Sequence, residues 1–240
     1  MIDTGRGITV RIALVEDDLT QTQQLTEWVK DAGHSIHCFS NGQAFNQAIR
    51  RESFDMVIMD WNLPDTTGLQ LLQQLRESGT LMAILFITSR DSEADIVSAL
   101  SKGADDYLVK PIRKAETLAR IASILRRTFG QTKESDKEHY PPFTLNHNYF
   151  TVALDDETIQ LTPKEYDLTC FMFQNHGRLL SRNHILESVW GLSSDLSTRT
   201  VDTHISKVRR KLGLKPERGW RLISVYQYGY RLESLNSANE

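Results

Sequence analysis

Polar side chains that could carry out chemistry stand directly after four apolar runs in the first half of the chain. The residues are Glu16, Asp17 and Asp18 after RIALV, Asp60 after MVIM, Thr88 after AILFI and Lys110 after DYLV. A carboxylate is costly to place at the end of a buried strand unless another group compensates its charge. We therefore expect these four segments to contribute to one shared site.

The elements that would position these residues alternate along the chain. Apolar runs at 11–15, 35–39, 55–59, 83–87 and 107–109 are separated by amphipathic segments near 20–32, 41–51, 67–77, 92–102 and 113–127. Strands separated by helices of this length cannot pair as hairpins, so the pattern predicts an α/β fold with a five-stranded, doubly wound parallel sheet. Loops at the carboxyl ends of such strands form the ligand crevice.

The residue types in this crevice favour phosphoryl chemistry. An all-oxygen cluster of carboxylates suits Mg²⁺, which keeps waters and leaves room for a phosphoryl oxygen. Lys110 and the hydroxyl of Thr88 would supply the positive charge and the hydrogen bond that a phosphoryl group needs. Asp60 would then act as a nucleophile. A lone aspartate after a strand is more often a helix or turn cap, and only the co-occurrence of all these residues favours the site.

The pattern changes in the second half of the chain. Residues 128–142 lose periodicity, gain charge and end in two prolines, which predicts a linker between a domain at 10–127 and a second domain at 143–235. Short strands are expected near 143–145, 149–154 and 158–161, followed by helices and a closing hairpin near 221–233. The first of these helices should begin at Thr162, with Pro163 at its first position and Glu165 completing a capping box.

Residues 197–213 predict a basic amphipathic helix that begins at Ser197 or Thr198 and ends at Gly213. Residues 197–221 hold 8 basic and 2 acidic side chains, a net charge of +6, whereas residues 1–127 hold 14 basic and 17 acidic ones, a net charge of −3. Val201, Ile205, Val208 and Leu212 form an apolar stripe. Predicted DNA contacts on the other side are Arg199, Thr200, Thr203, His204, Ser206, Lys207 and Arg210.

Arginine mixed with small hydroxyl side chains suits a helix in the major groove, where charge neutralises phosphates and short side chains allow close approach. A run of charges is more often a solvated helix face, so the helix pattern alone leaves both interpretations open.

Residues 10–127 resemble the receiver domain of two-component response regulators, through LVEDD, MDWNLPDTTG, FITSR and GADDYLVKP. The resemblance implies a flavodoxin-like fold and phosphotransfer from a sensor histidine kinase to Asp60. It also implies that Mg²⁺ is bound by Glu16, Asp17, Asp60 and the backbone carbonyl of Asn62. Thr88 and Tyr107 match the family's switch pair. Lys110 matches the lysine that contacts the phosphate. Asp18 lies one place beyond the acidic pair and is expected to be a helix-start charge.

Residues 143–233 resemble the winged-helix effector domain of the OmpR/PhoB class, through LTPKEYDL, LLSRNHILESVWG, STRTVDTHISKVRRKL and YGYRL. The resemblance implies that the helix at 198–212 recognises double-stranded promoter DNA, that the loop 190–196 can contact RNA polymerase, and that the last hairpin is a wing. Tyr226 and Gln227 stand where the class usually has an Arg-Gly pair. Arg218 or Arg221 would have to replace that arginine, and we include Arg221 among the predicted DNA contacts.

The same resemblance implies a homodimer on phosphorylation. The class pairs receivers through residues matching Asp105, Asp106, Glu116 and Arg120 and a basic residue on the fourth helix, where this chain has Ile96. Lys102 is a candidate replacement, and the pairing is expected to be weakened or rearranged.

The sequence thus predicts a phosphorylation-dependent transcriptional regulator that is not an enzyme beyond its own phosphotransfer and slow self-dephosphorylation. A Mg²⁺-dependent phosphatase would need a second catalytic acid two residues after Asp60, where Asn62 stands. A regulator with a decayed pocket would lack some of the site residues, all of which are present. No apolar run approaches the roughly 18 residues of a membrane span, and the N-terminus lacks signal-peptide order. We therefore expect a cytoplasmic protein with no membrane partner.

Overall fold

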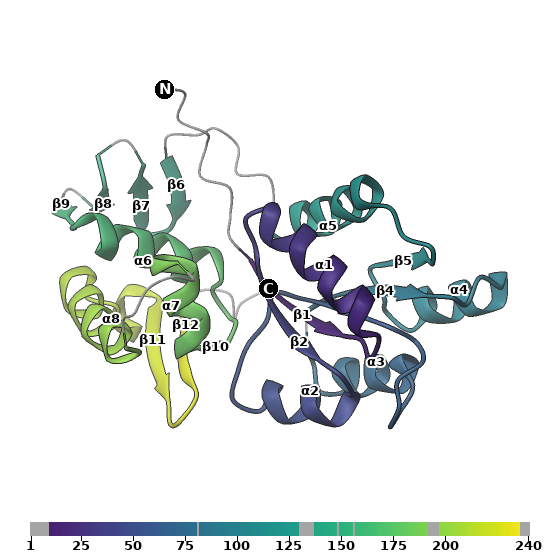
Figure 1. Cartoon of the computed structure of the whole chain (residues 1–240). Helices are drawn as coiled ribbons and strands as arrows, with labels where there is room; N and C mark the ends of the chain where they lie inside the picture. The colour runs from purple at the N-terminus through teal and green to yellow at the C-terminus, as the bar shows by residue number, and fades with distance from the viewer. Residues whose placement is uncertain are drawn as a thin grey trace. The chain divides into compact units, whose positions relative to one another are not determined.

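The computed structural model describes residues 10–80, 82–129, 137–147, 149–155, 157–191 and 197–235. These residues fold as two compact units, one formed mainly by the chain up to residue 131 and one by the chain from residue 132 onwards (Figure 1). Each unit has its own hydrophobic core. Within the described residues, no helix is both long enough and apolar enough to cross a membrane.

The first unit is a five-stranded parallel sheet with helices on both faces. Its strands are β1 (Arg11–Val15), β2 (Ser35–Phe39), β3 (Met56–Met59), β4 (Ala83–Thr88) and β5 (Asp106–Val109), in the order β2-β1-β3-β4-β5. Its helices are α1 (Leu19–Asp31), α2 (Gly42–Ile49), α3 (Gly68–Glu77), α4 (Glu93–Ser101) and α5 (Lys114–Phe129). The strand order and the parallel pairing confirm the predicted doubly wound fold.

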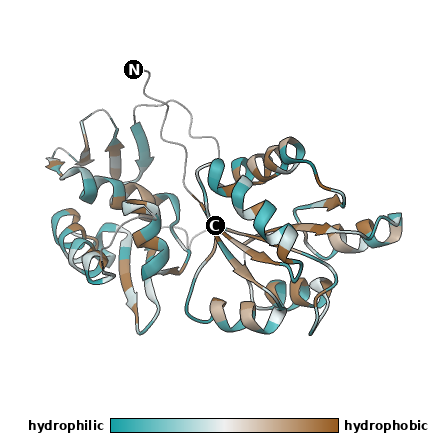
Figure 2. Ribbon diagram, in the orientation of Figure 1, coloured by the Kyte–Doolittle hydropathy of each residue, from teal (hydrophilic) through white to brown (hydrophobic). Residues whose placement is uncertain are grey.

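Burial on both faces explains the continuous apolar runs in the sequence. All five residues of β1 are buried, and alternate residues belong to different cores: Ala13 and Val15 pack in one, Ile12 and Leu14 in the other. Figure 2 colours the strands of this sheet as largely hydrophobic. A strand covered on both sides has no polar face, which is typical of parallel sheets.

Asp18 caps the beginning of helix α1, as predicted for this acidic residue. The Asp18 carboxylate accepts hydrogen bonds from the backbone N–H groups of Thr20 at 2.7 Å and Gln21 at 3.1 Å. These contacts satisfy N–H groups that have no partner within the helix. Asp18 is thereby occupied as a cap, which leaves its neighbours Glu16 and Asp17 for the crevice.

The second unit is an α+β winged helix-turn-helix domain, also as predicted. A four-stranded antiparallel sheet contains β6 (Lys137–Tyr140), β7 (Phe143–Asn146), β8 (Thr151–Leu154) and β9 (Glu157–Gln160). Three helices follow: α6 (Pro163–Gln174), α7 (Arg182–Trp190) and α8 (Arg199–Leu212), with β10 (Leu180–Ser181) before α7 and the short helix η1 (Pro216–Arg218) after α8. The hairpin of β11 (Trp220–Val225) and β12 (Gly229–Ser234) closes the domain and pairs with β10.

The predicted linker at 128–142 is wrong at both of its ends. Helix α5 extends to Phe129, and Lys137–Tyr140 forms strand β6, which pairs with β7 in antiparallel register. Pro141 and Pro142, which suggested an irregular segment, make the turn between these two strands. Strand β6 lies at the edge of its sheet, where a polar sequence is tolerated. Its charged residues therefore gave no strand pattern in the sequence. Residues 130–136 lie outside the described part of the chain.

Candidate functional site

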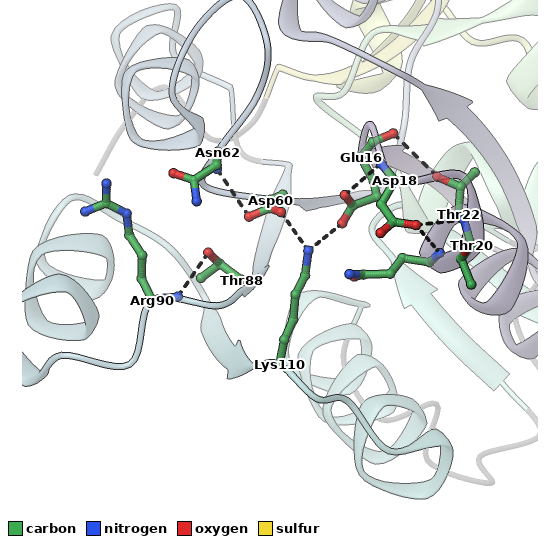
Figure 3. Close-up of polar contacts among 10 residues, drawn as sticks. Glu16, Asp18, Thr20, Thr22, Asp60, Asn62, Thr88, Arg90 and Lys110 are labelled. Atoms are coloured by element: carbon green, nitrogen blue, oxygen red, sulfur yellow. Dashed lines mark hydrogen bonds and ion pairs between the residues drawn. The ribbon is translucent and has the colours of Figure 1, made fainter.

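Side chains from three strands meet at the carboxyl edge of the parallel sheet. The Lys110 Nζ lies 2.6 Å from the Asp60 Oδ2 and 2.9 Å from the Glu16 Oε2, so one lysine bridges two acids (Figure 3). Glu16 is only 4% and Asp60 only 7% exposed. We call Glu16, Asp17, Asp60 and Lys110 the acidic pocket. The structure brings together the residues that chain order had placed at one edge.

Charge in the acidic pocket depends on the balance between burial and pairing. Burial raises the pKa of Glu16, and its hydrogen bonds from Lys110 and the Asp18 backbone only partly oppose this. Burial alone would lower the pKa of Lys110, but the hydrogen bonds to Asp60 and Glu16 outweigh it and the pKa is raised. Lys110 therefore remains a cation between the two carboxyl groups at neutral pH.

The donor set of the acidic pocket fits a hard divalent cation. Glu16, Asp17 and Asp60 each offer one carboxylate oxygen, and these oxygens lie within 4.8 Å of one another. Asp17 is exposed whereas the other two are buried, so an ion at this place would be open to water on one side. Mg²⁺ prefers such an arrangement of a few carboxylates and several waters.

Asn62 lies beside the nucleophile candidate. Its backbone N–H donates to the Asp60 Oδ1 at 3.2 Å, which orients that carboxylate (Figure 3). The side chain carries no acid, so Asn62 adds a neutral neighbour to the pocket. Its backbone carbonyl stays a predicted metal ligand.

Thr88 and Tyr107, the predicted switch pair, both contact the loop after β4. The Thr88 hydroxyl, on a fully buried residue, accepts from the Arg90 backbone N–H at 3.4 Å, a long contact. The Tyr107 hydroxyl donates to the Arg90 carbonyl at 2.7 Å, and burial raises its pKa to about 12. Tyr107 is only 7% exposed, so its ring already packs inside the unit. Among the described residues, no hydrogen bond joins the Thr88 hydroxyl to Asp60 or Lys110.

An aromatic row connects the residue after Asp60 with Tyr107. The ring centroid of Phe86 lies 5.7 Å from that of Trp61 and 6.1 Å from that of Tyr107. The Arg90 guanidinium stands 5.1 Å above the Trp61 ring and 3.4 Å from the Asp95 carboxylate. Sequence reasoning missed Arg90, because an arginine in a loop carries no pattern that sets it apart from a solvated one.

The tight turn after Asp60 depends on Gly68. A Cβ at this position would lie 2.3 Å from the Asp60 carbonyl oxygen and 2.8 Å from a ring carbon of Phe86. We expect Gly68→Ala to lower the free energy of unfolding by about 1–3 kcal/mol through overpacking, and to slow phosphorylation because the Asp60 backbone must move. Chemical denaturation and a phosphorylation time course would measure the two effects. Wild-type values in both would show that the loop adapts without cost.

Helix α8 has the two faces that the sequence predicts. Val201, Ile205, Val208 and Leu212 are at most 1% exposed and pack in the core of the domain. Of the predicted DNA contacts on α8, Arg199, Thr203, Ser206, Lys207 and Arg210 are exposed, and Thr200 and His204 are half-buried. Gly213 ends the helix in the left-handed conformation at φ 58°.

Polar contacts at both ends of α8, which sequence reasoning missed, fix the orientation of this helix. Near its beginning, Asp202 accepts from the Arg182 Nε at 2.8 Å and from the Tyr230 hydroxyl at 2.6 Å. Near its end, the Lys211 Nζ lies 2.7 Å from Glu165, which is 3% exposed and also closes the capping box of α6. The capping box was predicted, but the second partner of Glu165 comes from tertiary packing and has no local signal.

Both arginines considered as replacements for the wing arginine already have partners. Arg221 pairs with Glu233 at 2.8 Å, and the Arg218 Nη1 donates to the Leu212 carbonyl at 3.1 Å. Tyr226 at the hairpin tip is 85% exposed. In the predicted polymerase loop, Trp190 contacts the His204 ring at a centroid distance of 5.0 Å, and residues 192–196 lie outside the described part of the chain.

The predicted dimer face combines internal ion pairs with exposed apolar side chains. Arg120 bonds Asp106 and Glu116, each at 3.0 Å, and Asp105 pairs with Arg76 at 3.3 Å. On α4, Val97 is 54% and Leu100 43% exposed. The acids of this face are thus satisfied within one chain.

Known proteins share both halves of the chain. Residues 12–122 match the response regulator receiver domain, and residues 156–232 match the C-terminal domain of transcriptional regulatory proteins. Response regulator protein PmrA of Pseudomonas aeruginosa is 34% identical over 204 residues, which are 85% of this chain and 91% of PmrA. The alkaline phosphatase synthesis transcriptional regulatory protein SphR of Synechococcus elongatus is 32% identical over 232 residues, 92% of this chain and 90% of SphR.

Among solved structures, the response regulator DrrB of Thermotoga maritima, described as an OmpR/PhoB homolog, is 25% identical and has a TM-score of 0.47. The match covers 94% of this chain and 100% of DrrB. Taken with the two domain matches, PmrA and SphR identify a DNA-binding transcriptional regulator, which implies a histidine kinase partner and promoter DNA. The chain belongs to the OmpR/PhoB family of two-component response regulators.

Proposed function

We propose that Asp60 accepts a phosphoryl group from the histidine of a sensor kinase, and that this modification controls DNA binding by α8. The observation that carries the proposal is the Lys110 bridge to Asp60 and Glu16 at 2.6 and 2.9 Å, beside an exposed third carboxylate. This cluster places carboxylates at the carboxyl ends of the strands, where ligands of such sheets bind. A phosphoryl group and the Mg²⁺ ion that balances its charge could enter there.

In the proposed transfer, an Asp60 carboxylate oxygen attacks the phosphorus of the phosphohistidine. The new O–P bond forms as the N–P bond breaks, and the imidazole nitrogen keeps the electron pair. The Asn62 N–H orients the attacking carboxylate, and the Lys110 ammonium compensates the charge on the phosphoryl oxygens. Mg²⁺, held by Glu16, Asp17, Asp60 and the Asn62 carbonyl, would add electrostatic stabilisation when bound. Slow hydrolysis of the acyl phosphate would return the carboxylate.

Phosphorylation would then act on the residues around the β4–α4 loop. The aspartyl phosphate adds up to about two negative charges beside Thr88 and Lys110. We infer that Thr88 turns towards this charge and that the packed position of Tyr107 becomes more strongly favoured, which biases the α4 and α5 surface towards a homodimer. Pairing two receivers would raise the effective concentration of two winged helices on tandem half-sites.

The DNA contacts in this proposal are Arg199, Thr200, Thr203, His204, Ser206, Lys207 and Arg210 on α8, with Arg221 on the hairpin. Arg221 would have to exchange Glu233 for a phosphate, so its contribution is the smallest that we expect. The loop 190–196 is the proposed contact with RNA polymerase. Because its ligand is chromosomal DNA, we place the protein in the cytoplasm.

A phosphatase acting through an aspartyl phosphate is the alternative enzyme class. Its reaction needs a second carboxyl group two residues after the nucleophile, to protonate the leaving group and activate water. Asn62 occupies that place and offers only its backbone N–H to Asp60. Turnover of external phosphate esters is therefore not expected.

Trp61 offers a direct test of the metal site. It adjoins Asp60 and is 5% exposed, so its fluorescence should change saturably when Mg²⁺ is added. We expect Trp61→Phe to remove this response and Asp17→Asn to raise the Mg²⁺ midpoint by roughly tenfold or more, ~1.4 kcal/mol. A flat titration of the wild-type protein would instead favour a pocket that has lost its metal and its phosphate control.

A further inference from the structure

A second charged concavity lies in the winged-helix domain, at the end of α8. It is a cavity of about 610 Å³, lined by Glu157, Ile159, Ser206, Arg209, Arg210, Lys211, Gly213, Leu214, Lys215 and Arg218. We call it the basic groove. Five of its lining side chains are cations and one is an acid, so its net charge is +4. Ile159 and Leu214 form an apolar part of the wall.

Two of the cations are held in place before any ligand arrives. The Arg218 Nη1 donates to the Leu212 carbonyl at 3.1 Å, and the guanidinium lies so close to Gly213 that a Cβ there would be 2.6 Å from Nη1. Lys211 is fixed by its 2.7 Å ion pair with the buried Glu165. Preorganised charges lose little conformational freedom on binding.

The other three cations of the basic groove have no acidic partner among the described residues. Arg209, Arg210 and Lys215 make no side-chain hydrogen bond or ion pair in the described part of the chain, and the Arg209 Nε is enclosed without any hydrogen-bond partner there. That atom is enclosed by protein, so what the groove itself offers a ligand is the surplus of cationic side chains along its wall.

The position of the groove indicates its ligand. Ser206 and Arg210 belong to the exposed face of α8 that we assign to DNA, Arg209 is the neighbour of Arg210, and Gly213 caps the end of the helix. Lys215 and Arg218 follow after the helix has ended. Cations that continue a groove-reading surface beyond its helix meet the sugar-phosphate backbone, and phosphate oxygens suit arginine donors.

We infer that the basic groove is a phosphate-binding site, occupied by a backbone phosphate of DNA at the edge of the α8 footprint. The inference rests on DNA binding by this domain and adds Arg209, Lys215 and Arg218 to its contacts. These contacts would be to the DNA backbone. Because the phosphate is the same at every base pair, the three residues would add affinity without sequence preference. A free phosphorylated small molecule offers the same chemistry and is the other source of the ligand.

The test measures how salt weakens binding of the full-length protein to a random-sequence duplex. Each phosphate contact contributes about 0.9 to the slope of log K against log salt. We expect Lys215→Gln and Arg209→Gln each to lower this slope by about that amount and to weaken random and selected duplexes by the same factor. Lys30→Gln, an exposed lysine on α1, makes the same charge change and should leave the slope unchanged.

Titration of the protein with pyrophosphate and ATP, without DNA, forms the second arm. Saturable binding that Lys215→Gln abolishes, together with an unchanged DNA slope, would assign the groove to a small phosphorylated ligand. Unchanged slopes with no anion binding would overturn the inference and leave an acidic protein segment as the occupant. If wild-type protein failed to bind any duplex, the assignment of α8 would fail separately, and the anion titration would still decide the groove.

Discussion

Asp60→Asn is expected to abolish phosphorylation by a small-molecule phosphodonor such as acetyl phosphate. The amide has no anionic oxygen to attack phosphorus, and it also removes one oxygen from the candidate Mg²⁺ ligands. Intact-mass spectrometry would show the added phosphoryl group in the wild-type protein and not in the variant. DNA affinity should then no longer respond to the donor.

The matched control is Asp31→Asn, which removes an exposed carboxylate whose ion pair with Lys114 lies outside the acidic pocket. It should be phosphorylated at the wild-type rate. Persistent phosphorylation of Asp60→Asn would place the acceptor elsewhere, whereas loss in both variants would point to a folding defect. A thermal unfolding curve of each variant separates these cases.

Thr203→Glu is expected to weaken DNA binding by roughly 10- to 100-fold, about 1.4–3 kcal/mol. Thr203 is exposed in the middle of α8, and its hydroxyl donates back to the Arg199 carbonyl at 3.0 Å. A carboxylate there would face the negative field of the duplex, while glutamate keeps good helix propensity. Fluorescence anisotropy with a labelled duplex measures the change.

Gln73→Glu provides the control for net charge, because Gln73 is exposed on α3 in the receiver unit. It changes the charge of the protein by the same amount without touching α8. Equal weakening by both substitutions would mean that DNA responds only to total charge, and the assignment of α8 as the recognition helix would be wrong.

The parallel sheet could be predicted because its strands are covered on both faces and read as continuous apolar runs. The helix starts were also local: Thr162 with Glu165 forms the predicted capping box, and the Ser181 side chain caps α7. Strand β6 was missed because its residues are polar, as is common at the edge of a sheet, and only its pairing with β7 makes it a strand. Local sequence signals predict whether a segment forms a helix or a buried strand, but an edge strand depends on pairing with a neighbouring strand.

For the acidic pocket, chain order was enough to place the residues at one edge, because parallel strands end on the same side. The sequence did not reveal that Lys110 reaches two acids at once, since that depends on the side-chain geometry of three strands. The resemblance named Tyr107 as one half of a switch pair, but the sequence did not reveal that its ring packs beside Phe86 and that its hydroxyl donates to the Arg90 carbonyl. The contacts of Arg90 with Trp61 and of Asp202 with Tyr230 are tertiary, so no local sequence pattern predicts them.

The internal ion pairs of Arg120 bear on the energetics of receiver association. Asp106 and Glu116 already satisfy its guanidinium, so an assembly that recruits Arg120 exchanges one carboxylate for another and gains little Coulomb energy. In the proposed homodimer, the gain would then come mainly from covering exposed apolar side chains such as Val97 and Leu100 on α4. Association driven by apolar burial carries a negative heat-capacity change, so the affinity of phosphorylated receivers for each other should fall on cooling.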